Sequence, residues 1–211
     1  MIDGLGRVLV LGPHTDDGEF GCGGTIARLV SGGGEVYYAM FSLCEASVPD
    51  GYPKDVLKTE AIEASRRLGL SEDRLIFFDF PVRKFPSHRQ EILEVLVELR
   101  EKLEPDLVLV PSQHDTHQDH ETISREAWRA FKYTRVLGYE VPWNAREFTG
   151  DFFVGLTEAQ LDRKIHALRA YESQTFRHYA DLDFIRSLAQ VRGAQIKSPF
   201  AEALETFRWI G

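Results

Sequence analysis

The sequence is poor in cysteine and has no excess of basic residues. Only Cys22 and Cys44 occur among 211 residues. Two cysteines are too few for the disulfide framework of a small secreted domain, and they fit a reducing compartment. Lysine and arginine total 25 against 33 acidic residues, which gives a formal net charge of −8. Broad binding to a phosphate backbone needs a basic face, so we expect no nucleic-acid partner.

Long apolar runs are also absent. No stretch reaches the ~20 apolar residues that a membrane-spanning helix needs, and residues 1–12 lack the cleavage pattern of a signal peptide. The first predicted strand begins close to Met1, so we expect a cytoplasmic protein with no integral membrane segment. Because there is no repeat, linker or low-complexity segment, residues 1–211 are predicted to form a single domain.

Strand and helix patterns alternate along the chain. Apolar, β-branched runs predict strands, and apolar residues that recur every three to four positions predict helices. The predicted strands span 7–12, 35–43, 74–80, 106–111, 135–141, 152–155 and 205–210. The predicted helices span 25–31, 54–68, 87–103 with Ser87 as its cap, 121–131, 158–171 and 183–192. The alternation up to residue 131 predicts an α/β fold, a Rossmann-like three-layer domain with a mostly parallel central sheet.

Polar residues crowd the segment that follows the first predicted strand. The run Pro13-His14-Thr15-Asp16-Asp17-Gly18-Glu19 holds one imidazole and three carboxylates. In an open parallel sheet, ligands bind beyond the carboxyl ends of the strands. Carboxylates near apolar flanks are costly to desolvate unless a cation or hydrogen bonds compensate them. A divalent metal is the simplest compensation.

A second polar loop follows the strand predicted at 106–111. Its sequence is His114-Asp115-Thr116-His117-Gln118-Asp119-His120. Parallel strands end at the same edge of a sheet, so we expect the two loops to face one cleft. Two histidines and a carboxylate with one open position form a common catalytic zinc site. The candidates for this cleft are His14, Asp16, Asp17, His117, Asp119 and His120. Each motif alone is more often a turn or a helix cap; their pairing favours a metal.

These residues resemble the LmbE-like/PIG-L family of zinc-dependent N-deacetylases. The resemblance rests on Pro13-His14-Thr15-Asp16-Asp17 followed by Gly21-Cys22-Gly23-Gly24-Thr25, and on His117-Gln118-Asp119-His120 downstream. It covers residues 5–135 and implies an LmbE-like fold. It also implies zinc ligands at His14, Asp17 and His120, with another divalent metal as the alternative.

The resemblance further implies which residues carry the catalysis. Asp16 would be the general base on the metal-bound water, whose pKa zinc lowers to ~7. His117 would be the electrophilic or acidic partner, and Asp119 would hold its other ring nitrogen and favour the charged form. Two positions depart from the family's pattern, because Thr15 and Gly18 stand where proline and glutamate are common. Whether Glu19, one position later, replaces that glutamate stays open.

Other signals are weaker. Gly21-Cys22-Gly23-Gly24 lacks the spacing of a dinucleotide-binding loop, so close packing of helix on strand is expected, with Cys22 as a small buried side chain. His114 is expected to face solvent. Trp143 and Asn144 are candidates to stack on a sugar face and to bond a hydroxyl, although Trp143 fits a core position equally well.

Three arginines are candidates for a phosphate or carboxylate on the substrate. They are Arg83, Arg89 and Arg192, and a solvated or helix-capping role is the alternative for each. Arg83 is the one that we place among the possible substrate contacts.

The resemblance implies a hydrolase that removes an N-acetyl group from an N-acetylglucosamine-type amino sugar or its conjugate. The alternatives are a non-catalytic metal- or sugar-binding module, which would not need Asp16 and His117, and an amidohydrolase on a non-sugar N-acyl substrate. A nucleotide-dependent oxidoreductase would need a phosphate loop that the sequence lacks. The family often forms trimers or hexamers, and the apolar tail at 200–209 can supply contact area or cover a sheet edge.

Overall fold

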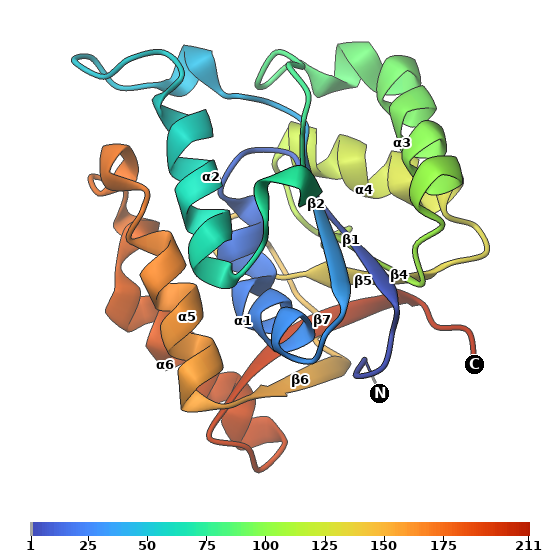
Figure 1. Ribbon diagram of the computed structural model, residues 1–211, viewed down its shortest axis with the longest axis vertical. Coiled ribbons are helices and arrows are strands. Elements are labelled where there is room, and N and C mark those ends of the chain that lie inside the picture. Colours follow the sequence, from blue (N-terminus) through green and yellow to red (C-terminus); the bar gives the residue numbers. More distant parts are fainter. Residues whose placement is uncertain (1) are drawn as a thin grey trace.

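The computed structural model describes residues 2–211, and Met1, the start of the predicted domain, lies outside the described residues. One sheet is built in the order β3-β2-β1-β4-β5-β7-β6 (Figure 1). Its strands are β1 (Arg7–Gly12), β2 (Glu35–Met40), β3 (Leu75–Phe77), β4 (Leu107–Pro111), β5 (Arg135–Tyr139), β6 (Phe152–Leu156) and β7 (Phe200–Arg208). The pairs from β3 to β5 are parallel, whereas β7 runs antiparallel between β5 and β6. The predicted, mostly parallel sheet is confirmed.

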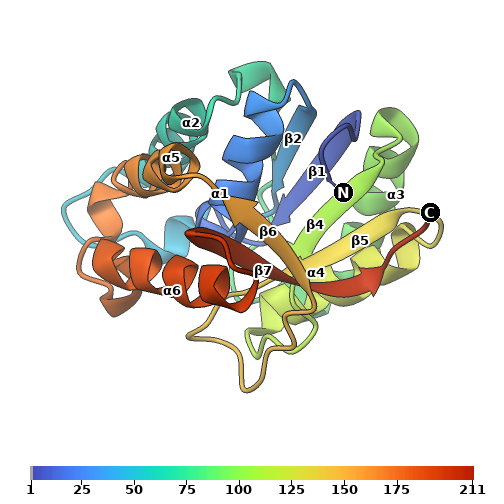
Figure 2. The same cartoon turned by 90° about the horizontal axis from the view of Figure 1, so that it is seen from below.

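Helices cover both faces of this sheet (Figures 1 and 2). One face carries α1 (Asp17–Ser31), α2 (Val56–Leu68), α5 (Glu158–Leu168) and α6 (Leu182–Gln195). The other carries α3 (Arg89–Leu103) and α4 (Gln118–Ala130). Short 3₁₀ turns are η1 (Glu45–Ser47), η2 (Glu72–Arg74), η3 (Phe85–His88), η4 (Glu172–Gln174) and η5 (His178–Ala180). The three-layer, Rossmann-like α/β architecture predicted from the sequence is therefore confirmed.

The central strands show why this sequence forms buried parallel strands. In β1, Val8 and Val10 belong to the core on the α1 side, whereas Leu9 and Leu11 belong to the core on the α3 side. Side chains alternate between the faces of a strand, so a strand covered on both faces needs apolar residues at every position. The unbroken apolar run of β1 meets that requirement.

Helix α1 begins at Asp17, so the prediction that it begins at Thr25 is wrong. The glycine-rich stretch that indicated a loop is helical. Its glycines are required because this helix lies very close to the sheet. A Cβ on Gly21 would lie 2.1 Å from the Tyr139 side chain, and one on Gly24 would lie 2.4 Å from the Leu156 side chain. These glycines confirm the predicted close packing of helix on strand.

The last strand is longer than predicted, since β7 begins at Phe200 rather than at 205. Phe200 and Leu204 are buried, and β7 pairs with β5 on one side and with β6 on the other, so this part of the apolar tail forms an interior strand of the sheet. Ser87 does not cap α3: it lies within η3, and the helix starts at Arg89 without a side-chain cap. None of the described helices is long and apolar enough to cross a bilayer.

The strand order creates one point where the chain changes direction across the sheet. From β1 the chain continues to β2 and β3 on one side, and it then crosses to β4 on the other side of β1. At such a switch point, the loops beyond the carboxyl ends of the two strands separate and leave a crevice. The two polar segments of the sequence follow β1 and β4, so the fold brings them to this crevice.

Candidate metal centre and active site

Two short loops lead from these strands into helices. Loop 13–16 joins β1 to α1, and loop 112–117 joins β4 to α4. Helix α4 starts at Gln118, three residues before the predicted Glu121, and His117 is its N-cap residue. The His117 Nδ1 atom accepts a hydrogen bond of 3.2 Å from the Asp119 backbone N–H. Each loop thus delivers its polar side chains at the first turn of a helix.

Three donor atoms from the two loops lie close together. They are Nδ1 of His14, Oδ2 of Asp17 and Nε2 of His120, and each pair is 3.2 Å apart. Zinc bonds of about 2.0–2.2 Å in a tetrahedron place neighbouring ligands about 3.3 Å apart. The donor set, two imidazoles and one carboxylate, is one that zinc commonly takes. We call these three residues the metal triangle, because their spacing and chemistry fit a divalent metal.

A buried carboxylate holds the other ring nitrogen of each histidine in the metal triangle. Asp119 Oδ2 lies 3.0 Å from His14 Nε2, and Asp115 Oδ2 lies 2.8 Å from His120 Nδ1. Such carboxylates fix the orientation of a ligating imidazole and raise its basicity. The sequence analysis missed Asp115, although it stands in the same polar loop as His120.

The prediction that the Asp119 carboxylate orients His117 is wrong. That carboxylate contacts His14 and also accepts the backbone N–H groups of Arg83 (2.5 Å) and Phe85 (3.2 Å). Asp119 lies in the first turn of α4, which directs its side chain toward η3. Only its backbone N–H reaches His117, so a main-chain donor orients that imidazole.

His117 lies beside the metal triangle. Its ring centroid is 4.8 Å from those of His14 and His120, and ligand atoms of the three histidines lie within 4.8 Å of one another. The Asp17 oxygen is closer to both triangle nitrogens, so Asp17 is the better third ligand. Burial and the nearby His14 and His120 lower the pKa of His117 to about 4. The ring is therefore neutral at pH 7, contrary to the charged form expected, and its Nε2 carries the proton because Nδ1 accepts.

Asp16 and Asp17 are neighbours with opposite electrostatic environments. Burial and the Asp17 charge raise the pKa of Asp16 to about 6. Burial also opposes the charge of Asp17, but His120 and His14 outweigh it and hold the pKa of Asp17 well below its usual range. The Asp16 carboxylate lines the cleft and makes no hydrogen bond with another residue of the described chain. Paired carboxylates whose pKa values are pushed apart are typical of acid–base sites.

The two histidines of the triangle are strongly basic. Burial disfavours their charged forms, but Asp17 together with the carboxylates behind them raises the pKa of His14 to about 9 and that of His120 to about 10. Both rings are therefore in the charged imidazolium form at neutral pH in the metal-free protein. Metal binding at this position must displace those protons.

A cavity of about 280 Å³ opens over the metal triangle. Besides the triangle, its lining includes Asp16, Arg83, His117, Trp143, Asn144, Gln174, Arg177 and Tyr179. The three predicted substrate residues, Arg83, Trp143 and Asn144, therefore all reach the cleft. Arg89 and Arg192 do not line it and instead pair with Glu126 and Glu140. His114 also lies outside the lining.

The segment after α5 supplies part of the cleft wall, which the sequence analysis did not foresee. Gln174, Arg177 and Tyr179 come from this segment. The Tyr171 hydroxyl donates a hydrogen bond of 2.6 Å to the Thr15 carbonyl oxygen and ties the segment to loop 13–16. Glu19 lies outside the cleft lining and accepts from the Tyr38 hydroxyl at 3.0 Å, so it supports the helix start from within the core.

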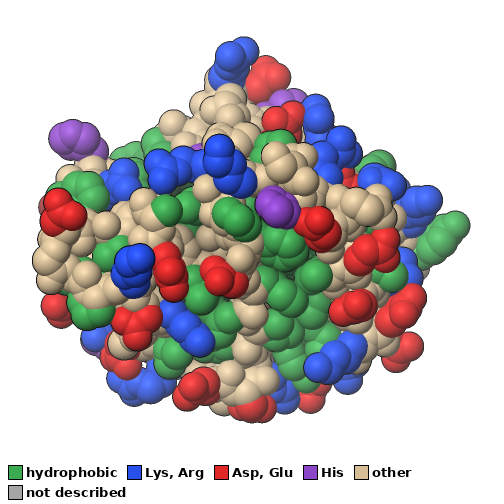
Figure 3. All heavy atoms as spheres, turned by 90° about the horizontal axis from the view of Figure 1, so that it is seen from above, with side chains coloured by type: hydrophobic (Ala, Val, Ile, Leu, Met, Phe, Trp, Pro, Cys, Tyr) green, Lys and Arg blue, Asp and Glu red, His purple; other side chains and the backbone are tan. Residues whose placement is uncertain are grey.

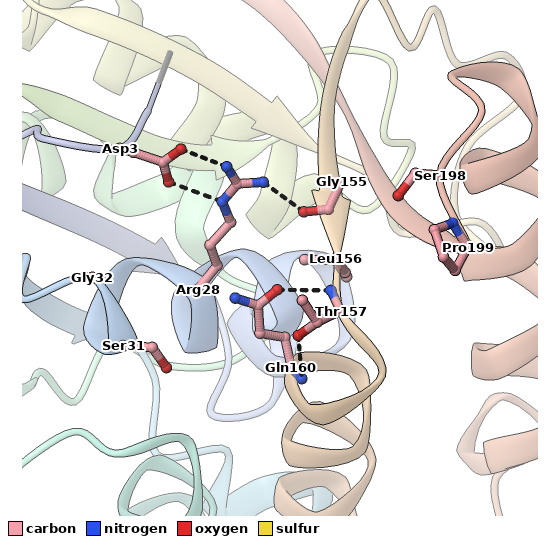
Figure 4. A pocket seen from close by; sticks show the side chains of 10 residues that line it. All are labelled: Asp3, Arg28, Ser31, Gly32, Gly155, Leu156, Thr157, Gln160, Ser198 and Pro199. Carbon is pink, nitrogen blue, oxygen red and sulfur yellow. Dashed lines mark hydrogen bonds and ion pairs between the residues drawn. The ribbon is translucent and has the colours of Figure 1, made fainter.

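A larger hollow of about 620 Å³ lies elsewhere on the protein, between the start of the chain and the α5 N-terminus (Figure 4). Its polar groups already bind one another. The Arg28 guanidinium donates to Asp3 and to the Gly155 carbonyl oxygen, and Thr157 and Gln160 form a reciprocal helix cap. The smaller cleft is therefore the better candidate site, because the metal triangle and the unbonded Asp16 carboxylate line its cavity.

A family profile described as PIG-L, GlcNAc-PI de-N-acetylase, matches residues 9–131, which include both loops of the cleft. The chain belongs to the PIG-L family. This PIG-L chain is also 28% identical over 186 residues to the probable N-acetyl-alpha-D-glucosaminyl L-malate deacetylase 2 of Bacillus subtilis (strain 168), a match that covers 80% of the chain and 83% of the relative.

Solved structures share the fold at lower identity. N,N'-diacetylchitobiose deacetylase from Pyrococcus horikoshii has a TM-score of 0.81 at 21% identity, covering 97% of this PIG-L chain and 84% of that protein. GalB, the 4-carboxy-2-hydroxymuconate hydratase of Pseudomonas putida, has a TM-score of 0.82 at 22% identity and covers 98% of both chains. At these identities the likeness shows the fold alone. Since one neighbour is a hydratase, the reaction has to be argued from the site.

Proposed function

We propose that this PIG-L protein is a zinc-dependent N-deacetylase, which removes the acetyl group from an N-acetylglucosamine-type amino sugar or its conjugate. The observation that carries the proposal is the metal triangle together with the unbonded Asp16 carboxylate beside it in one cleft. The family description and the names of the relatives, which include two N-acetyl-sugar deacetylases, support the same reaction class.

The proposed metal ligands are His14, Asp17 and His120. A divalent ion there would supply Lewis acidity, which polarises the amide carbonyl and lowers the pKa of water. Zinc fits the donor set, and another divalent ion remains the alternative. Asp115 and Asp119 hold the two imidazoles in the orientation that this role requires.

Asp16 is the proposed general base. Its carboxylate has no partner within the described chain, and its pKa of about 6 keeps it largely ionised but basic at pH 7. Efficient proton transfer needs a pKa close to the working pH. Asp16 accepts a proton from the attacking water. The protonated Asp16 then donates this proton to the leaving nitrogen. The products are acetate and a free amine.

His117 is the proposed electrophilic partner. The Asp119 backbone N–H occupies its Nδ1, so the neutral ring presents Nε2–H as a donor. A preorganised donor of this kind stabilises the negative charge that develops on the amide oxygen during attack. In this proposal Asp119 supports His14 rather than His117.

Two features favour a sugar over another N-acyl substrate. The Trp143 ring stacks on Tyr179 with centroids 4.3 Å apart and planes at 9°, and 37% of Trp143 stays exposed at the cleft. Asn144 lines the same wall and offers an amide for a hydroxyl. An aromatic face beside a hydrogen-bonding group is a usual arrangement for an amphipathic ligand. A purely metal-binding module would not need Asp16 and His117 at the same cleft. A cytoplasmic location and a homo-oligomer, trimer or hexamer, remain predictions.

The test is acetate release with and without metal. The purified protein is treated with a chelator, assayed, and assayed again after zinc is restored, with N-acetylglucosamine, N,N'-diacetylchitobiose and N-acetylglucosaminyl conjugates as substrates. The proposal predicts equal amounts of acetate and free amine from at least one substrate, loss of both on chelation and recovery with zinc. Hydrolysis that survives chelation, or no hydrolysis by zinc-loaded protein, would overturn it.

A further inference from the structure

Asp16 stands where a side chain usually caps a helix. It is the N-cap residue of α1, and aspartate is preferred at that position because its carboxylate accepts a backbone N–H from the first turn. The Asp16 side chain makes no such hydrogen bond. The N–H groups of the first turn have no partner inside the helix, so they need acceptors elsewhere. Another acceptor in this place would leave the Asp16 carboxylate free.

The hydroxyl of Tyr38 is such an acceptor. It receives the N–H of Gly18, the second residue of α1, at 2.9 Å. Tyr38 lies on β2, 20 positions further along the chain, and it is fully buried. A strand residue thus supplies the cap that the N-cap residue itself would ordinarily supply.

The buried Glu19 carboxylate fixes the Tyr38 hydroxyl. It accepts the hydroxyl hydrogen at 3.0 Å. Because a hydroxyl has one hydrogen to donate and two lone pairs that accept, donation to Glu19 leaves the lone pairs for Gly18. The Thr15 carbonyl oxygen is farther from this hydroxyl, at 3.4 Å, and takes a shorter bond of 2.6 Å from Tyr171. We call Tyr38 and Glu19 the cap pair.

Two glycines make room for the Tyr38 hydroxyl. A Cβ on Gly12, at the end of β1, would lie 2.8 Å from the hydroxyl oxygen, and a Cβ on Gly18 would also lie 2.8 Å from it. Neither glycine has a positive φ, so backbone freedom does not explain them. Since both positions leave space for the same oxygen, the contact between Tyr38 and α1 is built into the local sequence.

The cap pair acts from beneath the cleft. Figure 3 shows the molecule from above the carboxyl ends of the central strands, where histidine, acidic and basic side chains reach the surface. Tyr38 and Glu19 are fully buried, and neither lines the cavity over the metal triangle. A substrate in that cavity does not touch them, so an effect on the reaction has to pass through another residue.

Asp17 is held in place independently of the cap pair. Its Oδ2 accepts the His14 backbone N–H at 2.8 Å and lies 3.2 Å from a ring nitrogen of each triangle histidine. The Asp16 carboxylate has no comparable contact. Loss of the cap should therefore draw Asp16 toward the free Gly18 N–H, while Asp17 keeps its position in the metal triangle.

We propose that Tyr38, held by Glu19, is a positioning residue that caps α1 in place of Asp16 and so leaves the Asp16 carboxylate free to act as the general base. The role of Asp16 in this statement rests on the proposed function. Without the Tyr38 hydroxyl, Asp16 takes the ordinary N-cap bond and turns away from the attacking water. A displacement of about 1 Å in a reacting group can cost about 10² in rate.

The first test is Tyr38→Phe, which removes only the hydroxyl. The variant should keep its zinc and a KM close to that of the wild type, while kcat falls by about tenfold to a hundredfold. Tyr139→Phe is the matched control, because its buried hydroxyl donates to the Leu11 carbonyl oxygen at 2.8 Å and does not cap α1. It should keep the wild-type kcat. Equal loss of kcat in both variants, or loss of zinc in Tyr38→Phe, would overturn the proposal.

Substitutions of Glu19 and Gly18 break the same contact from other sides. Glu19→Met removes the acceptor of the Tyr38 hydroxyl and should lower kcat by about tenfold, whereas Glu19→Gln keeps an oxygen there and should recover most of the activity. Gly18→Ala places a Cβ in the space of the hydroxyl. Alanine favours helices more than glycine does, so a merely helix-forming role would preserve kcat, and the proposal predicts its loss. Unchanged kcat in both Glu19→Met and Gly18→Ala would contradict the proposal even if Tyr38→Phe fails to fold.

A crystal structure of zinc-loaded Tyr38→Phe gives a readout that does not depend on activity. The proposal predicts an Asp16 carboxylate oxygen about 3 Å from the Gly18 nitrogen. An Asp16 side chain that stays in its wild-type position would overturn it. If the wild-type protein hydrolyses none of the substrates named above, the proposed function fails, and the position of Asp16 in this variant still decides whether Tyr38 replaces it as the cap.

Discussion

Helix α1 contacts two polar clusters, and they differ in whether every charged group has a partner within the chain. At its first turn lie the metal triangle, Asp16 and the carboxylates behind the triangle. At its kink, Cys22 has non-helical angles, and Lys164 pairs with Glu202 at 2.7 Å. In the kink cluster every charge has a partner within the chain. At the first turn Asp16 faces open space. Closed polar clusters hold the fold, and the open one is where chemistry is proposed.

The kink cluster illustrates how a broken helix is completed. The Glu202 carboxylate accepts the N–H groups of Gly24 (2.9 Å) and Thr25 (2.6 Å), and Lys164 Nζ donates to the Phe20 carbonyl oxygen (2.7 Å). These backbone groups lose their helical partners at the kink, and burying them unpaired would be costly. The ion pair therefore allows α1 to bend against the sheet.

The largest effect should follow from removing a triangle histidine. His120→Ala leaves only two ligands, so zinc content should fall from about one ion per chain to near zero, and activity should fall to that of the chelated protein. Elemental analysis together with an acetate-release assay measures both. His114→Ala alters the same loop outside the cleft and should keep the metal. Full zinc content in His120→Ala would remove this residue from the ligand set.

Breaking the ion pair of the kink cluster should instead lower the stability of the folded protein. Lys164→Met leaves Glu202 buried without its counter-ion, which typically lowers the free energy of unfolding by about 3–5 kcal/mol. Denaturant titration measures this change, and zinc binding by the folded fraction should persist. Arg66→Met breaks an ion pair in solvent and should have little effect. Equal, small changes in both variants would show that the kink cluster does not differ from a surface pair.

A smaller effect is expected from the carboxylate behind His120. Asp115→Asn keeps the shape but loses the charge that orients the imidazole, at 2.8 Å from its Nδ1. Such partners are typically worth 10–100-fold in metal affinity, so the zinc dissociation constant should rise by about that factor. Competition with a chromophoric chelator gives this constant. An unchanged value would mean that Asp115 serves folding alone.

The smallest expected effect is the release of protons from the triangle histidines when zinc binds. His14 and His120 have pKa values of about 9 and about 10 in the metal-free protein, so zinc binding at pH 7 must release protons. Calorimetry in buffers of different ionisation enthalpy should show release of one to two protons, and zero release would contradict these assignments. Because both pKa values are raised, the protonated rings stabilise the metal-free fold fully below about pH 6.5, and this contribution is lost as the pH rises through 9 and 10.

The sequence allowed the sheet and the shared cleft to be predicted because their signals are local. Apolar runs ending in polar residues marked the strand ends, and parallel strands must bring the two polar loops to one edge. The choice of His14, Asp17 and His120 as metal ligands came from the family resemblance and stays a prediction. The partner of Asp119 was assigned wrongly, because the sequence does not report that the Asp119 side chain contacts His14 across the cleft while only its backbone N–H reaches His117. The helix start at Asp17 was missed because glycine predicts a loop unless the facing Tyr139 is known.

Contacts between distant parts of the chain could not be predicted. Glu202 caps backbone groups 177 and 178 positions earlier, and no local pattern indicates that pairing. Arg177 and Tyr179 reach the cleft only because Tyr171 and Ser173 tie their segment to Thr15 and Glu60. Such placements follow from tertiary packing, which periodicity does not report.

The most direct test of the account compares two adjacent carboxylates, Asp16 as base and Asp17 as ligand. Asp16→Asn and Asp17→Asn make the same chemical change one position apart, and zinc content and kcat are measured for both on one substrate. The account predicts that Asp16→Asn keeps its zinc and loses about 10²–10⁴ in kcat, since an amide cannot accept the proton. It predicts that Asp17→Asn loses most of its zinc. Loss of zinc in Asp16→Asn, with metal and activity retained in Asp17→Asn, would contradict it.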